Sequence, residues 1–394
     1  MPERQPTGSW LDPGLSTALH HVRWLAALLV LLHHARLHTI GSYGSDVASA
    51  DSIAVRAFFF VTGLGHEAVI GFFVLSGVLI AGRFAHRPPA TAADYGDYLL
   101  DRLTRIWIVA LPALLLSVAV AQASQQLLGG FYDGGGESCA PGLSDLIGNL
   151  LFLHKLFVPT LCSNGPYWSI QNEVWYYLAL PAIFVAASAP VAWLRVAVLA
   201  VLIAAVGALL LLDRWGAHNT LAYFPIWLAG ALVATGWRCR VPPALGAAFL
   251  VAALLVARAS TDWHFLLKDY LVGLALLTLL LAVKGGRLPA SWQAPGLVGL
   301  SRRFAGFSYS LYLTHAPVIY LLRTLLEKVY GVGLPIRAVA PPALAIMLLE
   351  SLVALAVAWL FYLAFERHTA ALRAIIRSRL GRNRAALARA APEG

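Results

Sequence analysis

About ten apolar runs, each close to the ~20 residues that a helix needs to cross a bilayer, occupy most of this 394-residue chain. We therefore predict an all-α fold, a polytopic membrane helix bundle of about ten transmembrane helices. A shorter apolar stretch, residues 53–64, fits an interfacial or re-entrant piece. The predicted crossings centre on residues 17–36, 68–84, 105–126, 168–187, 191–212, 219–237, 242–259, 265–284, 304–326 and 339–365.

The charged residues are too few for a soluble protein. They make up 12% of the chain, against about one-quarter in soluble domains, and the mean hydropathy is +0.73. We expect a cytoplasmic tail over residues 1–16, one membrane domain over 17–366 and a basic cytoplasmic tail over 367–394. The first sixteen residues lack the apolar core of a cleavable signal peptide, so the first span is expected to act as an uncleaved signal anchor.

The basic residues predict the orientation. With ten crossings, nineteen Lys and Arg fall on the side of the two termini and seven on the other, which favours cytoplasmic termini in the cell inner membrane. The formal charge of +10 is therefore an orientation signal. Outside the tail there is no basic face interleaved with aromatics, so we expect no nucleic-acid partner. The tail itself is expected to lie on anionic lipid.

The three cysteines suit this topology. Cys139 and Cys162 both fall in a long outer loop, where a disulfide would persist, whereas Cys239 falls in an inner loop. A bridge between the first two is one expectation, and two unpaired thiols are the alternative. No spacing of cysteines and histidines indicates a metal.

Two ionisable residues, Arg23 and His34, lie inside one of the most apolar stretches. Eleven residues are close to three helical turns, so both side chains are expected on one helix face, about 16 Å apart along the axis. Ionisable groups in a bilayer are costly and usually face a bundle interior or an aqueous cavity. The alternative is that Arg23 anchors one end of the helix and His34 is a surface histidine near the other.

Four further polar clusters interrupt the apolar pattern. Arg102 and Arg105 lie three residues apart, which turns two planar guanidinium groups towards one ligand and suits phosphate binding. Glu173 opens a predicted span, Ser76-Gly77 allows a close helix approach, and a hydroxyl-rich strip covers residues 308–315. Each has a simpler reading, since the arginines suit membrane anchors, Glu173 could neutralise an arginine, and the serines could serve helix packing. Together they predict a polar cavity.

In order along the chain, these segments resemble the acyltransferase-3 family of integral membrane acyltransferases. The resemblance rests on Arg23-x10-His34, FFVLSGVLI (72–80), RLTRI (102–106), YWSIQNEVWYYLALP (167–181), FSYSLYLTH (307–315) and FER (365–367). It runs from about residue 19 to 367. The chain departs from the family pattern where many members have Arg-Ile-x-Pro, because Pro112 comes late, and where Glu-Arg-Pro is expected, because His368 follows Arg367.

The resemblance implies a ten-helix membrane domain that transfers an acyl group, commonly acetyl, from cytosolic acyl-CoA to a hydroxyl of a carbohydrate or glycosylated product. No bound cofactor is implied, since acyl-CoA is a co-substrate. The expected partners are acyl-CoA, a hydroxyl-bearing glycan or glycosylated small molecule such as a cell-envelope glycan or a macrolide, and the lipid bilayer.

Acyl transfer to an alcohol needs a base, an oxyanion donor and a grip on the donor's carrier. We expect His34 to be the base, with His33 as its rival, and Glu173 to orient the imidazole. Arg23, Arg102 and Arg105 are expected to bind the phosphates of CoA. The possible oxyanion or acceptor contacts are Ser169, Tyr309 and His315.

Two alternatives remain open at this point. His34 lies towards the outer end of its helix, so either a deep channel admits the pantetheine arm, which we favour, or an acyl-enzyme intermediate forms. The competing function is a proton-coupled transporter or exporter of a small polar molecule, with His34 and Glu173 as a proton relay. No internal repeat between residues 1–190 and 191–394 supports that function.

Overall fold

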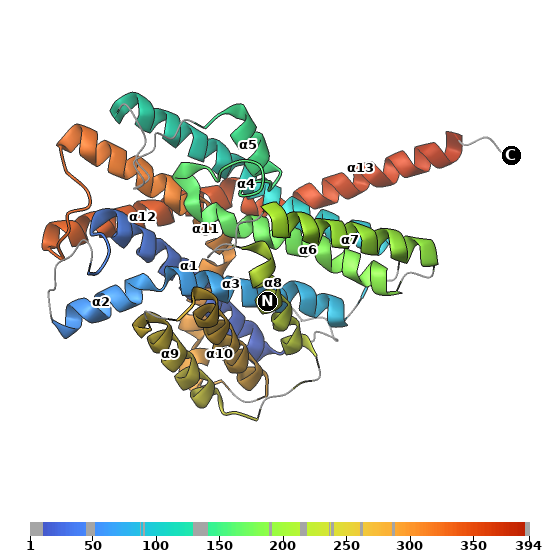
Figure 1. Cartoon of the computed structure of the whole chain (residues 1–394), viewed down its shortest axis with the longest axis horizontal. Coiled ribbons are helices and arrows are strands. Elements are labelled where there is room, and N and C mark those ends of the chain that lie inside the picture. The colour runs from blue at the N-terminus through green and yellow to red at the C-terminus, as the bar shows by residue number, and fades with distance from the viewer. Residues whose placement is uncertain are drawn as a thin grey trace.

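The fold is an all-α bundle, seen in a computed structural model (Figure 1). The structure describes residues 11–44, 52–86, 88–89, 91–128, 141–188, 191–212, 219–235, 237, 240–260, 263–285 and 288–390, and these contain no β-strand. The helices are α1 (Pro13–Thr39), α2 (Ile53–Gly63), α3 (Gly65–His86), α4 (Ala92–Leu128), α5 (Leu143–Leu150), α6 (Trp168–Ser188), α7 (Ala192–Leu212), α8 (Thr220–Ala229), α9 (Pro243–Ala259), α10 (Phe265–Gly285), α11 (Pro295–Tyr330), α12 (Pro341–Ala364) and α13 (Thr369–Ala390), with short 3₁₀ turns η1 (Cys162–Tyr167), η2 (Gly230–Ala234), η3 (Ala290–Gln293) and η4 (Glu366–His368).

Each of the ten apolar runs falls on a helix, with residues 219–237 divided between α8 and η2. Six segments of the described residues are long and apolar enough to cross a membrane: Pro13–Thr39, Ile53–Phe84, Ala93–Leu127, Ala192–Leu212, Phe265–Lys284 and Pro341–Leu380. Two shorter apolar segments are Thr220–Ala234 and Pro243–Ala259. The chain is thus a multi-pass membrane protein, and the number of about ten crossings stays a prediction.

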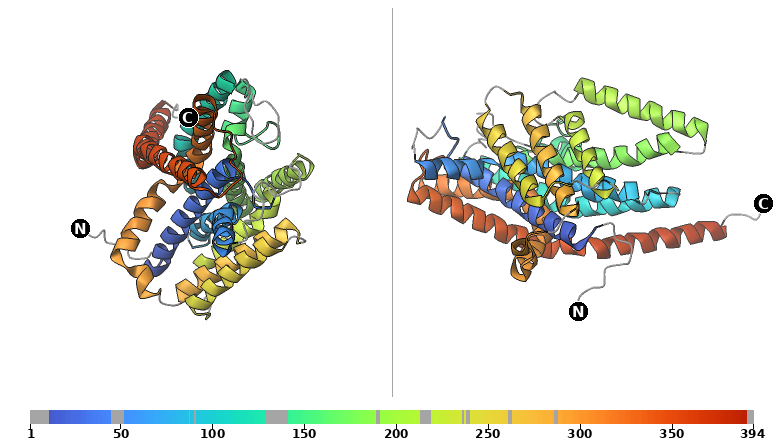
Figure 2. Two further views of the ribbon diagram at one scale, coloured as in Figure 1. Left: turned by 90° about the vertical axis from the view of Figure 1, so that its left-hand side faces the viewer. Right: turned by 90° about the horizontal axis from the view of Figure 1, so that it is seen from below.

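Helix α1 lies at the centre of the bundle and packs against α3, α10, α11 and α12 (Figures 1 and 2). Its first residues are ordered by the Asp12 side chain, which accepts a hydrogen bond from the Leu15 backbone N–H at 2.7 Å, and by Pro13 at the first helical position. Because its neighbours cover several sides, α1 can carry Arg23 and His34 in the interior instead of presenting them to lipid.

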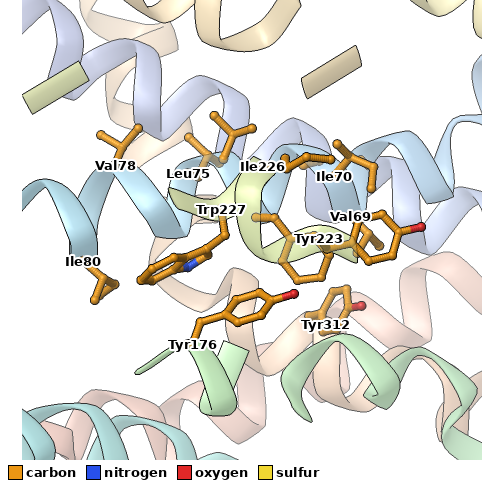
Figure 3. Packing of buried hydrophobic residues seen from close by; sticks show 14 of the residues in the cluster. Val69, Ile70, Leu75, Val78, Ile80, Tyr176, Tyr223, Ile226, Trp227 and Tyr312 are labelled. Carbon is orange, nitrogen blue, oxygen red and sulfur yellow. The ribbon is translucent and has the colours of Figure 1, made fainter. Parts of the chain in front are cut away.

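Helices α3 and α8 approach each other closely at glycines. Trp227 and Ile226 from α8 lie against Leu75 and Val78 of α3 in the apolar core (Figure 3). At Gly77 an added Cβ would overlap the carbonyl oxygen of Trp227. The close approach expected from the Ser76-Gly77 pair is therefore present.

Replacing Gly77 by alanine is expected to destabilise the fold strongly. The Cβ would meet backbone rather than a movable side chain, so α3 and α8 would have to separate, at a cost of about 1–3 kcal/mol or more. Gly306→Ala is the matched control, because nothing lies within 4 Å of that Cβ and alanine favours a helix interior. Thermal unfolding in detergent should show a lower Tm for Gly77→Ala and no loss for Gly306→Ala. Equal Tm values for the two variants would contradict the close packing.

The chain after α12 folds back onto α11 and α4. The carboxylate of Glu366 accepts hydrogen bonds from the backbone N–H and hydroxyl of Ser310, at 3.1 and 2.7 Å. Helix α13 then projects beyond the bundle (Figures 1 and 2). Its first turns are held by Arg373, which pairs with Asp101 at 2.9 Å, and by Arg377, which contacts Asp97 and Asp101.

Cys162 is disulfide-bonded. Cys139 and Cys239 lie outside the described residues, so the predicted pairing of Cys139 with Cys162 stays a prediction.

Candidate active site

A polar cavity of about 300 Å³ lies between α1, α3, α4, α6 and α11. Apolar residues of α3 line one part of it, and charged and hydroxyl-bearing side chains line the rest. These polar residues are Arg23, Ser76, Arg102, Arg105, Ser169, Glu173, Tyr177, Ser308, Tyr309 and Tyr312. Five helices thus converge on one cavity.

Three arginines give the cavity its charge. Arg102 and Arg105 come from consecutive turns of α4, and Arg23 reaches the same space from α1. The Nε atom of Arg102 is buried and has no hydrogen-bond partner among the described residues. A buried guanidinium donor without a partner is costly, so an anionic ligand placed here would gain a strong charge-assisted hydrogen bond.

Glu173 is the carboxylate of the cavity, and a chain of hydrogen bonds ends on it. The Trp227 indole N–H donates to the Ser76 hydroxyl at 3.0 Å, and Ser76 lies 3.1 Å from the Tyr177 hydroxyl, which donates to Glu173 at 2.9 Å. The Tyr177 hydroxyl uses its one proton for Glu173, so Ser76 donates to Tyr177. This direction fixes one carboxylate oxygen of Glu173 in place.

His34 makes a pair with His315 instead of with a carboxylate. Its Nδ1 lies 2.9 Å from the Val30 carbonyl and 3.3 Å from His315 Nε2. A carbonyl only accepts, so Nδ1 of His34 carries the proton. Nδ1 of His315 lies 3.0 Å from the Leu311 carbonyl and therefore also carries the proton of its ring. In the neutral His34 ring, Nε2 then holds the lone pair and has no partner among the described residues.

Aromatic rings separate the cavity from this histidine pair. Tyr312 lines the cavity, and its ring centroid lies 5.9 Å from that of His315 and 5.7 Å from that of Phe72. Phe73 also lines the cavity and contacts Trp168 at 5.9 Å. We call Phe72, Phe73, Trp168 and Tyr312 the aromatic layer.

The structure places the eight sequence-predicted site residues in two groups. Six line the cavity: Arg23, Arg102, Arg105, Ser169, Glu173 and Tyr309. The other two, His34 and His315, contact each other behind Tyr312. No hydrogen bond joins His34 to Glu173 among the described contacts, so the expected pairing of these two groups is not seen in this conformation, and their catalytic roles stay predictions.

The hydroxyls expected near an oxyanion are already engaged. Tyr312 donates to the Pro166 carbonyl at 3.0 Å, so Ser169, at 2.7 Å, donates to the Tyr312 oxygen. Tyr309 donates to the Ile106 carbonyl at 3.2 Å. Either hydroxyl would have to leave its partner to bind an oxyanion.

Sequence reasoning missed Tyr177 and Tyr312. Tyr177 follows Glu173 by four residues, the spacing of neighbours on one helix face, which could have indicated their contact. For Tyr312 the signal was weaker, since only its position three residues before His315 placed it near the histidine pair.

The described residues contain no cluster of three or more His, Cys, Asp or Glu side chains that could hold a metal ion. The polar groups of the cavity are suited to binding an anionic organic ligand.

Comparison with known proteins gives the class. The family model described as "Acyltransferase domain" matches residues 16–363, most of the chain. The chain therefore belongs to the acyltransferase-3 family. Searches of curated proteins and of solved structures returned no match.

Proposed function

We propose that this protein is a membrane O-acyltransferase that moves an acyl group, most simply acetyl, from cytosolic acyl-CoA to a hydroxyl of a carbohydrate or glycosylated acceptor. The observation that carries the proposal is the convergence of three arginines and one carboxylate in a cavity that adjoins a pair of histidines. In this proposal both termini are cytoplasmic, as the distribution of Lys and Arg favours.

The arginines are the proposed donor site. CoA carries phosphates at one end and a thioester at the end of a long pantetheine arm. Phosphates bind best to planar, permanently charged guanidinium forks, and Arg102 and Arg105 offer two of them one helical turn apart. Arg23 extends this positive surface along α1 towards His34, which lies about 16 Å further along the helix.

His34 is the proposed base. Its protonated Nδ1 is fixed by the Val30 carbonyl, which leaves Nε2 to accept the proton of the acceptor hydroxyl. The hydroxyl oxygen then bonds to the thioester carbon, the carbon–sulfur bond breaks, and the CoA thiolate takes up the proton from His34. Tyr312 lies between the histidine pair and the cavity, so the thioester must pass its ring.

Glu173 acts from within the cavity in this proposal. It does not touch His34, but its carboxylate lies near Arg23 and Arg105, whose charges act on it. A negative charge among three positive ones lowers the repulsion between the guanidinium groups and holds them in place before the donor binds. The charge of Glu173 also favours the protonated form of the His34 imidazole, and this effect weakens as the distance between the two groups increases.

The function is tested by release of free CoA thiol. Purified protein in lipid nanodiscs should release CoA from acetyl-CoA and form an O-acetylated product when a set of methyl glycosides is offered. Acetyl-pantetheine, which has the same thioester but no CoA phosphates, should show a KM about 10–100-fold higher, because it loses charge-assisted hydrogen bonds. Thiol release that is absent with every glycoside, or equal KM values for the two donors, would refute the proposal.

A further inference from the structure

A further imidazole, that of His66, is backed by a carboxylate. Nε2 of His66, at the start of α3, lies 3.0 Å from both carboxylate oxygens of Asp269 on α10. The Tyr223 hydroxyl donates to the same carboxylate at 2.8 Å. Asp269 and Tyr223 are buried, whereas the His66 side chain is 34% exposed.

The hydrogen bonds decide which nitrogen of His66 is open. A carboxylate accepts, so Nε2 carries the proton that it donates to Asp269. In the neutral ring the lone pair then lies on Nδ1, which has no hydrogen-bond partner among the described residues. An acid that fixes one imidazole nitrogen and leaves the other open to a substrate is the arrangement of catalytic Asp–His pairs.

Two contacts place His66 on the side of the aromatic layer that faces away from the arginines. Trp168 of that layer stacks on His66, with ring centroids 6.5 Å apart and an angle of 22° between the planes. The ring of His33 packs against Gly65, where an added Cβ would lie 2.5 Å from His33 Cβ. Because His33 lies ten residues beyond Arg23 on α1, these two residues are about 15 Å apart along the helix axis.

We propose that His66, oriented by Asp269, binds the acceptor: its Nδ1, the nitrogen not bound to Asp269, makes a hydrogen bond with an acceptor hydroxyl on the side of the aromatic layer remote from the arginines. This inference rests on the proposed function and adds the acceptor-binding group to it. The donor is held at one end of α1, and the acceptor is held at the other, next to His33 and His34.

Two substitutions at His66 separate this role from a structural one. His66→Gln places an amide nitrogen near the original Nε2, so the bond to Asp269 is kept and the open Nδ1 is lost. His66→Asn does the opposite, since its amide reaches about the place of Nδ1 and cannot reach Asp269. A group that only ties α3 to α10 would tolerate Gln and not Asn, whereas an acceptor-binding group would tolerate Asn better than Gln.

The test measures transfer from acetyl-CoA to the methyl glycoside that the wild type uses best. His66→Gln should raise the acceptor KM by about tenfold with an unchanged donor KM and Tm, as expected for one lost hydrogen bond. His86→Gln, at an exposed histidine in the last turn of α3, is the control and should change nothing. An acceptor KM unchanged in His66→Gln would overturn the inference, even if His66→Asn failed to fold.

Direct binding keeps the inference separate from the proposed function. Saturation-transfer NMR on nanodiscs reports contact between methyl glycosides and the protein without turnover. If the wild type released no CoA but bound a glycoside that His66→Gln did not bind, the transferase function would fail and the binding site would stand. Equal signals for the two proteins, or none for the wild type, would refute the site.

Discussion

Replacing His34 by asparagine is expected to reduce kcat for acyl transfer by about 10²–10⁴-fold, the usual contribution of a general base. The asparagine amide reaches about the place of Nδ1, so it can still donate to the Val30 carbonyl, while the open Nε2 is lost. The variant should therefore fold normally but catalyse acyl transfer very slowly. The measurement is the release of CoA thiol at saturating donor and acceptor, together with the Tm of the purified variant.

His33→Asn is the matched control for this prediction. His33 is the neighbour of His34 on α1, its ring lies 5.2 Å from that of His34, and its Nδ1 lies 3.5 Å from a guanidinium nitrogen of Arg36. Adjacent helical residues point about 100° apart, so only one of the two can face the reacting atoms. A greater loss of kcat in His33→Asn than in His34→Asn would reverse the assignment of the base.

The His34 variant also distinguishes the two routes for the acyl group. If the thioester reaches the acceptor directly, His34→Asn should still bind acetyl-CoA with the affinity of the wild type and carry no label after incubation with acetyl-labelled donor. A stably acylated wild-type protein, formed without acceptor, would instead show that a covalent intermediate crosses the gap.

Local sequence spacing predicted which arginines lie together. The pair Arg102 and Arg105, and the long separation of Arg23 from His34 on one helix, follow from helix geometry alone, and all three arginines do line one cavity. The close approach at Gly77 was likewise predictable, because a Ser-Gly pair inside an apolar run leaves no side chain to keep another helix away.

Partners from distant segments could not be predicted in the same way. His66 and Asp269 are 203 positions apart, and His34 and His315 are 281 apart, so only the packing of α3, α10 and α11 around α1 shows which groups meet. We expected Glu173 beside His34 because a carboxylate commonly orients a catalytic imidazole. The structure shows that Tyr177, one turn along the same helix, is the hydrogen-bond donor to Glu173.

Replacing both Arg102 and Arg105 by alanine is expected to raise the KM for acetyl-CoA by more than 100-fold. Each charge-assisted hydrogen bond contributes about 1.5–3 kcal/mol, or roughly 10–100-fold in binding. The KM for acetyl-pantetheine should change little, since this donor has no CoA phosphates to lose. The variant without the two arginines and the donor without the CoA phosphates thus complete a double-mutant cycle. Once either partner is removed, removing the other should have little further effect on the KM.

Arg83→Ala is the control for this cycle, because Arg83 is an exposed arginine in the last turn of α3 and does not line the cavity. If Arg102 and Arg105 only anchored α4 at the membrane surface, their removal would lower the Tm and affect both donors equally, as would any general loss of folded protein. A selective effect on the phosphate-bearing donor requires contact between these guanidinium groups and CoA. Arg102→Lys should recover only part of the loss, because an ammonium group supplies the charge without the planar fork that binds two phosphate oxygens at once.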